Sequence, residues 1–386
     1  MKCLSTKATS IKPSGIRKFF DLASTMEGVI SLGVGEPDFA TPWHICENAI
    51  HYMSTGHTHY TANRGLLELR EDICKFHKEH YNQVYDPENE VIVTIGGSEA
   101  IDLCMRALLN PGDEVIVLDP NYVAYAPSVI LSDGVVVPLK LKEENDFKII
   151  PEDLKKVITP KTKAMIINYP SNPTGGVMTK EDYAKIIDII KESGIYVISD
   201  EIYAELSFDQ PFASLAQFDE IKSQIIVVNG FSKAYAMTGW RLGYCMANKE
   251  LSSVMNKIHQ YVIMSAPVMS QYAGIEAIKN GYNDVLMMKD DYLKRRNFLV
   301  NRLNRMGLKT NMPHGTFYVF CNIQSTGLDS ETFCERLLQE QKVACVPGNA
   351  FGNSGEGYVR ISYAYSIDHI KEAVVRLEQF LKDLDN

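Results

Sequence analysis

The sequence lacks any long apolar run, which excludes a membrane-spanning helix. None of its 386 residues lies in a window that approaches the roughly 18 consecutive apolar residues that such a helix requires. The first residues, Met1 to Lys7, also lead into no apolar segment of the kind found in secretory signal peptides. We therefore expect a cytoplasmic protein with no membrane partner.

Paired cysteines are lacking too, which argues against a disulfide framework and against a typical zinc site. The eight cysteines are scattered, with no Cys-x-x-Cys pair and no histidine pair at zinc-ligand spacing near them. A chain of this length does not need disulfides to stabilise its core. We expect reduced, mostly buried thiols and no bound metal.

The third feature that the sequence lacks is an excess of basic residues. The chain has 39 Lys and Arg residues against 48 Asp and Glu residues, so its net charge is −9. Because no local basic stripe offsets this charge, we expect no nucleic-acid partner. The remaining composition, 45% apolar and 23% charged residues, is typical of a folded globular protein. The length suits two or three domains.

The middle of the chain alternates between short β-branched runs and longer amphipathic segments, with a helix expected from Ser98. The expected strands are residues 91–94, 115–118, 165–168, 196–199 and 225–229. Continuous apolar strands separated by helix-length segments are typical of a largely parallel sheet that is covered on both faces. The fold class is therefore predicted to be α/β.

The pattern changes after residue 280, where a smaller α+β domain is expected. Its predicted elements are a charged helix over 284–306, strands over 316–321 and around Val343 and Tyr358, and a terminal helix from Ser366. We expect an N-terminal segment (1–45) that packs with this small domain, a large domain (46–280) and the small C-terminal domain (281–386). No internal repeat or long Pro/Gly/Ser linker separates these units.

Polar residues directly follow several predicted strands, where open α/β sheets bind their ligands. Residues 95–100 (Ile-Gly-Gly-Ser-Glu-Ala) follow one strand and open a helix, so they form either an anion site or an ordinary helix cap. Residues 169–175 (Tyr-Pro-Ser-Asn-Pro-Thr-Gly) follow another, and their prolines would hold the Asn172 amide in a fixed direction. A generic turn would have a similar composition.

Two further strand ends carry charged residues. Asp200 and Tyr203 follow the strand 196–199, and Lys233 follows the strand 225–229, with Arg241 eight residues later. Each of these groups alone could have an ordinary structural role as a helix cap, a member of an ion pair or a solvated surface cation. Together they provide the groups that pyridoxal 5′-phosphate needs: a lysine for the aldehyde, an acid for the pyridine nitrogen, and donors for the ring oxygen and the phosphate.

These residues resemble those of the class I aminotransferases, which are fold type I enzymes dependent on pyridoxal phosphate. The resemblance runs from residues 14–17 (Ser-Gly-Ile-Arg) to 358–362 (Tyr-Val-Arg-Ile-Ser), and so covers nearly the whole chain. Its most specific segments are residues 33–38 (Gly-Val-Gly-Glu-Pro-Asp), 171–175, 199–203, 232–233 and 239–243 (Gly-Trp-Arg-Leu-Gly). The resemblance implies a large domain with a mostly parallel seven-stranded sheet, a smaller α+β domain, and a homodimer whose active sites are shared across the interface.

The resemblance also implies roles for particular residues. Lys233 would bind the cofactor aldehyde, Asp200 would pair with the pyridinium nitrogen, and Lys233, Asp200 and Tyr203 would be the catalytic residues. The other expected cofactor-binding residues are Gly97, Ser98, Glu99, Tyr122, Asn172, Ser232 and Arg241, with Tyr60 contributed from the neighbouring subunit. The expected substrate-binding residues are Gly35, Asn172, Arg360, which would bind the α-carboxylate, and Ile16. Residues 14–17 would belong to a mobile part that closes over the substrate.

The implied reaction is the transfer of an amino group from an L-amino acid to a 2-oxo acid, by analogy 2-oxoglutarate, with ping-pong kinetics. Aspartate-preferring members often carry a lysine where Ser98 stands, although Arg17 or Arg64 could replace it if either reaches the pocket. Residues 14–19 (Ser-Gly-Ile-Arg-Lys-Phe) and 170–173 (Pro-Ser-Asn-Pro) resemble those of bacterial aminotransferases for N-acetyl-diaminopimelate or aromatic amino acids, so we rank these donors above aspartate. The alternatives are a β-lyase that uses the same cofactor and a ligand-sensing regulator. Such regulators carry a DNA-binding domain before this fold, and we expect none here because the resemblance begins by residue 14.

Overall fold

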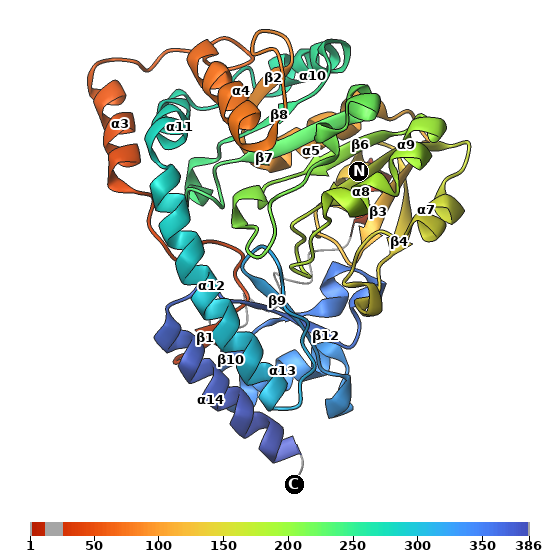
Figure 1. The fold of residues 1–386 in the computed structure, drawn as a ribbon, viewed down its shortest axis with the longest axis vertical. Coiled ribbons are helices and arrows are strands. Elements are labelled where there is room, and N and C mark those ends of the chain that lie inside the picture. Colours follow the sequence, from red (N-terminus) through yellow and green to blue (C-terminus); the bar gives the residue numbers. More distant parts are fainter. Residues whose placement is uncertain (1, 12–25, 385–386) are drawn as a thin grey trace.

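A seven-stranded sheet forms the centre of the larger part of the molecule (Figure 1). The computed structural model describes residues 2–11 and 26–384. The strand order is β2 (Val91–Thr94), β8 (Gly243–Met246), β7 (Ile225–Gly230), β6 (Tyr196–Asp200), β5 (Thr162–Asn168), β3 (Glu114–Asp119) and β4 (Val135–Lys140). Strand β8 runs antiparallel to β2 and β7, and the remaining pairs are parallel. The predicted mostly parallel, seven-stranded sheet is confirmed.

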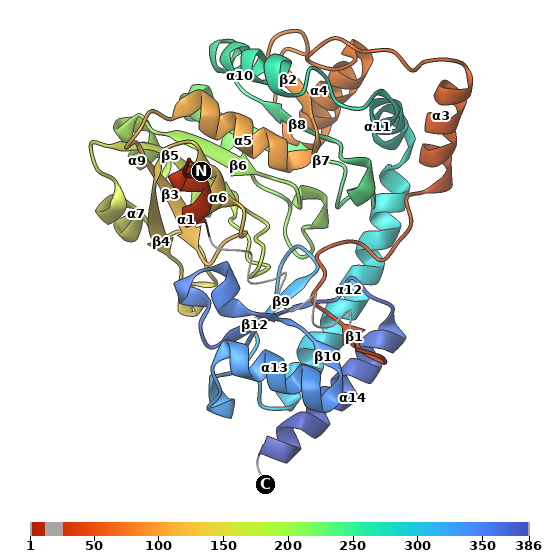
Figure 2. The same cartoon turned by 180° about the vertical axis from the view of Figure 1, so that it is seen from behind.

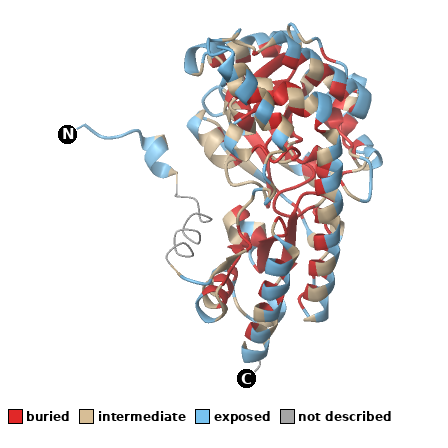
Figure 3. Ribbon diagram, turned by 90° about the vertical axis from the view of Figure 1, so that its left-hand side faces the viewer, coloured by how far each residue is buried: buried red, intermediate tan, exposed pale blue. Residues whose placement is uncertain are grey.

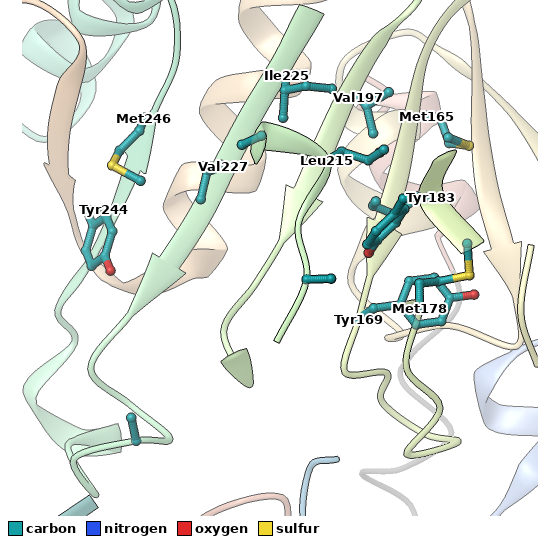
Figure 4. Packing of buried hydrophobic residues seen from close by; sticks show 14 of the residues in the cluster. Met165, Tyr169, Met178, Tyr183, Val197, Leu215, Ile225, Val227, Tyr244 and Met246 are labelled. Atoms are coloured by element: carbon teal, nitrogen blue, oxygen red, sulfur yellow. The ribbon is translucent and has the colours of Figure 1, made fainter. Parts of the chain in front are cut away.

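Successive side chains of each central strand lie on opposite faces of the sheet and pack in different cores. In β5, Ala164 and Ile166 belong to the core on one face, while Met165 and Ile167 belong to the core on the other. Figure 4 shows the second of these cores, with Met165 beside Val197 of β6. A strand that is covered on both faces needs apolar residues at every position, which explains its continuous apolar run.

Helices cover both faces of the sheet. One face packs against α5 (Gly96–Leu108), α6 (Tyr125–Leu131) and α10 (Lys249–Val262), which Figure 2 shows in front. The other packs against α4 (Leu67–Tyr81), α7 (Pro151–Val157), α8 (Lys180–Ala184), α9 (Ile187–Ser193) and α11 (Val268–Asn280). The helix α3 (Trp43–Ser54) lies against α11 on the outside. The carboxyl ends of the parallel strands face the smaller part of the molecule.

The smaller part is built on a three-stranded antiparallel sheet in the order β11 (Val346–Pro347), β12 (Tyr358–Ser362) and β9 (Tyr318–Asn322). The helices α12 (Tyr282–Arg305), α13 (Ser330–Gln341) and α14 (Ile367–Leu384) enclose a second core with this sheet. Buried residues fill both parts, and the outer faces of the helices are exposed (Figure 3). The expected α+β character of this region, its long charged helix and its terminal helix are present.

The N-terminal residues contact both parts. Strand β1 (Ile30–Ser31) pairs in parallel with β10 (Val343–Ala344) of the smaller part. The short helix α1 (Thr6–Ser10) instead lies beside α6 of the larger part, where Lys7 Nζ is 2.8 Å from Asp133 Oδ2. Helix α3 begins at Trp43, just before the expected boundary at residue 45, and α12 begins at Tyr282, just after the expected boundary at residue 280. The division into domains stays a prediction.

Three further observations concern the described residues alone. No helix among them has the length and apolar character needed to cross a membrane. No group of three or more His, Cys, Asp or Glu side chains in this part of the chain is arranged to hold a metal ion. The eight cysteines are free thiols, and Cys334 Sγ and Cys345 Sγ lie 3.4 Å apart in the core of the smaller part.

Candidate active site

A cavity of about 570 Å³ lies at the carboxyl ends of the parallel strands, between the two parts of the molecule. Strands β5, β6 and β7 each lead to polar residues that line it, and β12 contributes Arg360 from the smaller part. Its lining residues with polar or charged side chains are Glu36, Ser98, Tyr122, Tyr125, Ser128, Asn168, Asn172, Asp200, Tyr203, Ser232, Lys233, Thr238, Arg241, Tyr318 and Arg360. Groups from both parts therefore meet in one cavity.

At one end of the cavity, the start of α5 lies against a guanidinium group. Gly96 has a φ of +70°, and a Cβ on this residue would come within 2.8 Å of Arg241 Nη2. The neighbouring strand approaches equally closely, because a Cβ on Gly243 would lie 2.5 Å from the Gly96 carbonyl carbon. Glycines at these positions thus bring free backbone N–H groups, the helix N-terminus and a cation together, which is the chemistry of an anion site.

A buried carboxylate lies at the end of β6. Asp200 is 8% exposed. Its Oδ2 accepts a hydrogen bond from Tyr125 Oη at 2.6 Å, and its Oδ1 accepts one from the Ile202 backbone N–H at 3.2 Å. Burial raises the pKa of Asp200 to about 6, although both hydrogen bonds act in the opposite direction. A cationic partner in the cavity would stabilise the ionised form of this group.

A half-buried lysine follows β7. The Nζ of Lys233 donates a hydrogen bond to the Gly35 carbonyl oxygen at 2.6 Å. Burial, together with the nearby charge of Arg360, lowers the pKa of Lys233 to about 8. A larger fraction of this amine is therefore neutral near pH 7 than in an ordinary lysine, which favours its reaction as a nucleophile.

Arg360 connects the smaller part to the loop after β5. Its Nη1 donates to Asn172 Oδ1 at 2.9 Å, and its Nη2 donates to the Gly33 carbonyl oxygen at 2.6 Å. The guanidinium group also lies 4.2 Å from the ring centroid of Tyr318. Its Nε is buried and has no hydrogen-bond partner among the described residues. An unpaired buried donor on a fixed guanidinium group is suited to an added carboxylate.

Aromatic residues form other walls of the cavity. The hydroxyl groups of Tyr203 and Tyr318 lie 3.0 Å apart, and Tyr122 packs edge-on against Tyr125. A Cβ on Gly35 would lie only 2.4 Å from Tyr318 Oη, so no larger residue fits at position 35 without movement. The phenol groups thus have fixed positions beside Lys233 and Arg360.

The structure brings most of the predicted site residues to this cavity. Those that line it are Gly35, Gly97, Ser98, Tyr122, Asn172, Asp200, Tyr203, Ser232, Lys233, Arg241 and Arg360. Glu99 lies in the first turn of α5, but its carboxylate contacts His259 rather than the cavity. Tyr60 is 84% exposed and lies outside the cavity. The expectations for Ile16, Arg17 and the mobile segment 14–17 fall outside the described residues.

Arg64 does not line the cavity. Its Nη1 donates to Ser252 Oγ at 2.7 Å and to the Val91 carbonyl oxygen at 3.3 Å. This arginine therefore holds its own segment against α10 and β2. Arg64 could replace a lysine at position 98 only if it reached the pocket, and in this arrangement it does not.

Sequence reasoning missed several residues of the cavity, among them Tyr125, Asn168 and Tyr318. Asn168 ends β5, where its Nδ2 donates to the Asp200 carbonyl oxygen at 2.9 Å and its Oδ1 accepts from the Asn172 backbone N–H at 2.9 Å. Its position as the last residue of a predicted strand was an available signal. Tyr125 follows Tyr122 by three residues, which is the spacing of neighbours on a helix, but its partner Asp200 is remote in sequence.

The donor set fits pyridoxal 5′-phosphate. The cradle at Gly96, the Arg241 guanidinium group and the hydroxyl groups of Ser98 and Ser232 suit a phosphate, while Asp200 suits a protonated ring nitrogen. Lys233, with its lowered pKa, suits an aldehyde. The cavity thus combines one group of each kind that this cofactor requires.

Comparison with known proteins agrees with this geometry. The model of the family "Aminotransferase class I and II" matches residues 27–377, and the chain belongs to this family. It is 50% identical to the putative aminotransferase YugH of Bacillus subtilis over 98% of each chain, and 43% identical to aromatic-amino-acid aminotransferase 2 of Thermococcus litoralis, again over 98% of each. Among solved structures, the aromatic aminotransferase of Pyrococcus horikoshii matches with a TM-score of 0.91 and 43% identity, over 95% of this chain and 99% of that one. The chain is an aminotransferase dependent on pyridoxal phosphate, as its sequence predicted.

Proposed function

We propose that this aminotransferase uses an aromatic amino acid or N-acetyl-diaminopimelate as donor in preference to aspartate, with 2-oxoglutarate as acceptor. The observation that carries the assignment of the site is the convergence of a half-buried lysine, a buried aspartate and a partly unpaired arginine on one cavity. The preference for aromatic amino acids over aspartate rests on charge, because their side chains need no further cation, whereas N-acetyl-diaminopimelate has a second carboxylate and rests on the resemblance alone. The cations that line the cavity in the described part of the chain are Lys233, Arg241 and Arg360, and each has another task.

Each lining group has a task in holding the cofactor. Lys233 would hold the aldehyde, and Asp200 the protonated ring nitrogen. Tyr203 and Asn172 would donate to the ring oxygen, and Tyr122 would stack on the ring. The start of α5 with Gly97 and Ser98, together with Ser232 and Arg241, would hold the phosphate. These assignments are supported by the location of all these residues in one cavity.

When bound, pyridoxal phosphate supplies an aldehyde that takes up the amino group and a ring that withdraws electrons from the substrate Cα. Arg360 would bind the substrate α-carboxylate through its planar guanidinium group, and Gly35 leaves the space beside Tyr318 in which the substrate lies. The Lys233 amine would then take the proton from Cα as general base and deliver it to C4′ of the cofactor as general acid. Asp200, kept ionised by its cationic partner, would stabilise charge in the ring.

Reduction with borohydride tests the site. Treatment of the holoenzyme followed by peptide mapping is expected to label Lys233, and Lys233→Ala is expected to abolish both the label and transamination. A label on another lysine in active enzyme would contradict the assignment. Release of pyruvate and ammonia without a 2-oxo acid would favour the β-lyase reaction instead.

A panel of donors tests the substrate. With 2-oxoglutarate as acceptor, we expect kcat/KM for phenylalanine, tyrosine or N-acetyl-diaminopimelate to exceed that for aspartate. Parallel double-reciprocal lines are expected for the ping-pong mechanism of the family. A preference for aspartate would show that a cation from outside the lining described above reaches the second carboxylate.

We also propose that two copies of the chain form a dimer in the cytoplasm, with Tyr60 of each reaching the phosphate site of the other. The 84% exposure of Tyr60 supports this role, because a tyrosine serving its own cavity would be buried there. Other large apolar side chains on α3 and at the end of α10 are also exposed, as expected for an interface. They include Trp43, Ile50, Met53, Tyr261 and Val262. The free thiols are consistent with a cytoplasmic location.

A further inference from the structure

We propose that Glu99 and His259 are positioning residues for the cofactor phosphate, because they join the turn at the start of α5 to the segment of residues 60–66. This inference rests on the proposed function, which assigns that turn to the phosphate. Neither side chain lines the cavity. Both act through the backbone segments that they hold.

The Glu99 carboxylate fixes the residue before the cradle. Its Oε2 accepts a hydrogen bond from the Ile95 backbone N–H at 2.5 Å, and its Oε1 lies 2.6 Å from His259 Nδ1. Ile95 is the N-cap residue of α5, directly before Gly96 with its positive φ. A carboxylate held at this point therefore sets the direction in which the first N–H groups of α5 face.

His259 bridges two hydrogen-bond acceptors in a fully buried position. Its side chain is 0% exposed, and its Nε2 lies 2.9 Å from the Asn63 carbonyl oxygen. A carbonyl oxygen only accepts hydrogen bonds, and an ionised carboxylate also only accepts them. When both contacts are made, His259 therefore joins two oxygen atoms from separate segments of the chain. Removing either member of this buried pair leaves a polar atom of the other without its hydrogen-bond partner.

The segment that His259 contacts is held from several sides. Asn63 Nδ2 donates to the Met264 carbonyl oxygen at 2.8 Å, and the Leu66 backbone N–H donates to Gln271 Oε1 at 2.7 Å. The Val93 N–H donates to the Arg64 carbonyl oxygen at 3.0 Å, next to the strand end that leads into the cradle. The exposed Tyr60 stands at the start of this segment. One chain of contacts thus joins the protomer's own cradle to the residue proposed to enter the partner's site.

A second buried histidine provides a matched control. His77 is also 0% exposed, and its ring nitrogens lie 2.6 Å from Gln83 Oε1 and 2.8 Å from Tyr244 Oη. None of these three residues lines the cavity. Substitution of His77 therefore disturbs a buried, doubly bonded histidine without touching the phosphate cradle.

The experiment compares the affinity of the full-length protein for pyridoxal 5′-phosphate with its affinity for pyridoxal, which lacks the phosphate. The dissociation constant for pyridoxal divided by that for pyridoxal 5′-phosphate isolates the contribution of the phosphate. For His259→Leu and Glu99→Gln we expect this ratio to fall by about tenfold, which corresponds to about 1.4 kcal/mol. His259→Asn, whose amide nitrogen replaces Nδ1, is expected to restore most of it. The ratio should stay unchanged in His77→Asn.

Ser98→Ala and Arg241→Gln separate this inference from the proposed function. A ratio that falls in these two variants but not in Glu99→Gln would overturn the positioning role and leave the phosphate site intact. A ratio unchanged in Ser98→Ala and Arg241→Gln would overturn the proposed phosphate site itself. An equal fall in His77→Asn would show general loosening of the fold and also overturn the positioning role. Glu99→Gln preserves the shape of the side chain, so the test stands even where His259→Leu does not fold.

Discussion

At the scale of single residues, the cavity shifts the pKa values of two ionisable groups toward neutral pH. Burial raises the pKa of Asp200 to about 6 and lowers that of Lys233 to about 8. Each shift disfavours the charged form of its group. A bound cofactor with a cationic ring nitrogen would favour the ionised carboxylate again, so cofactor binding and the charge of Asp200 are linked.

Tyr125 supports that carboxylate. In Tyr125→Phe, Asp200 loses a hydrogen bond of 2.6 Å to its ionised form, so the pKa of Asp200 should rise further. We expect kcat to fall roughly tenfold, in line with about 1.5 kcal/mol for a hydrogen bond to a charged group. The acid limb of the kcat profile against pH should shift upward.

The control is Tyr81→Phe, because the buried Tyr81 hydroxyl has no hydrogen-bond partner among the described residues. This variant should retain kcat and its pH profile. A Tyr125→Phe enzyme with an unaltered profile would contradict the role given to the hydroxyl group.

Gly35 is expected to set the size of the substrate site. In Gly35→Ala the new Cβ would lie 2.4 Å from Tyr318 Oη, so the phenol on which the Arg360 guanidinium group packs must move. We expect KM for the amino donor to rise about tenfold with little loss of stability. Gly239→Ala, where a Cβ would meet no atom within 4 Å, is the matched control. Steady-state kinetics with both variants would show equal KM values if Gly35 had no such role.

At the scale of elements, the central strands could be predicted because burial on both faces leaves continuous apolar runs. Two strands of the seven-stranded sheet escaped prediction for identifiable reasons. β4 is an edge strand that contains Pro138, and a proline argues against a strand unless the position is at an edge. β8 has only 4 residues and directly follows the loop that carries Arg241, so its short apolar run carries little signal.

The same reasoning explains which site residues could be predicted. Asp200 and Lys233 follow predicted strands directly, so local sequence and strand order place them together. Tyr318 and Gly33 come from segments remote from these strands, and their contacts depend on how the smaller part packs against the larger. Local sequence patterns carry no information about that packing.

One histidine joins three helices and makes stability dependent on pH. His44 of α3 lies 2.7 Å from Glu276 of α11 through Nδ1 and 3.0 Å from Asp284 of α12 through Nε2. Burial alone would lower the pKa of His44, but the hydrogen bonds to both carboxylates outweigh it and raise the pKa. Because the folded pKa exceeds the unfolded one, the bridge stabilises the protein fully below about pH 6.5. This contribution is lost as the pH rises through the folded pKa.

We therefore expect His44→Gln to lower the free energy of unfolding at pH 5.5 by under about 1 kcal/mol, since the bridge is partly exposed. The difference from the unmodified protein should shrink at pH 9. Denaturant titrations at both pH values measure it, with the exposed His369 as control through His369→Gln. A difference that grows with pH would have the wrong sign for this bridge.

At the scale of the whole molecule, a mixed dimer tests whether Tyr60 serves the other subunit. A Lys233→Ala chain and a Tyr60→Ala chain are each expected to be inactive or weakly active alone. When the two are mixed and allowed to exchange, one site of each mixed dimer would combine an intact Lys233 with an intact Tyr60 from the other chain. We expect activity to recover to roughly a quarter of that of the unmodified enzyme at random pairing.

A tyrosine that served its own subunit would give no recovery, because each site would then lack one of the two residues. Size-exclusion chromatography of each variant provides the control for dimer formation. Recovery must also disappear when both substitutions are placed on the same chain.

Helix α12 begins at Tyr282 beside the large sheet and continues for 24 residues into the smaller part. At 1.5 Å per residue it forms a rod roughly 36 Å long. Used as a lever, such a rod converts a tilt of about 5° at its first turn into a displacement of roughly 3 Å at its far end. A tilt of this rod would therefore change the distance between Arg360 on β12 of the smaller part and Asp200 at the end of β6.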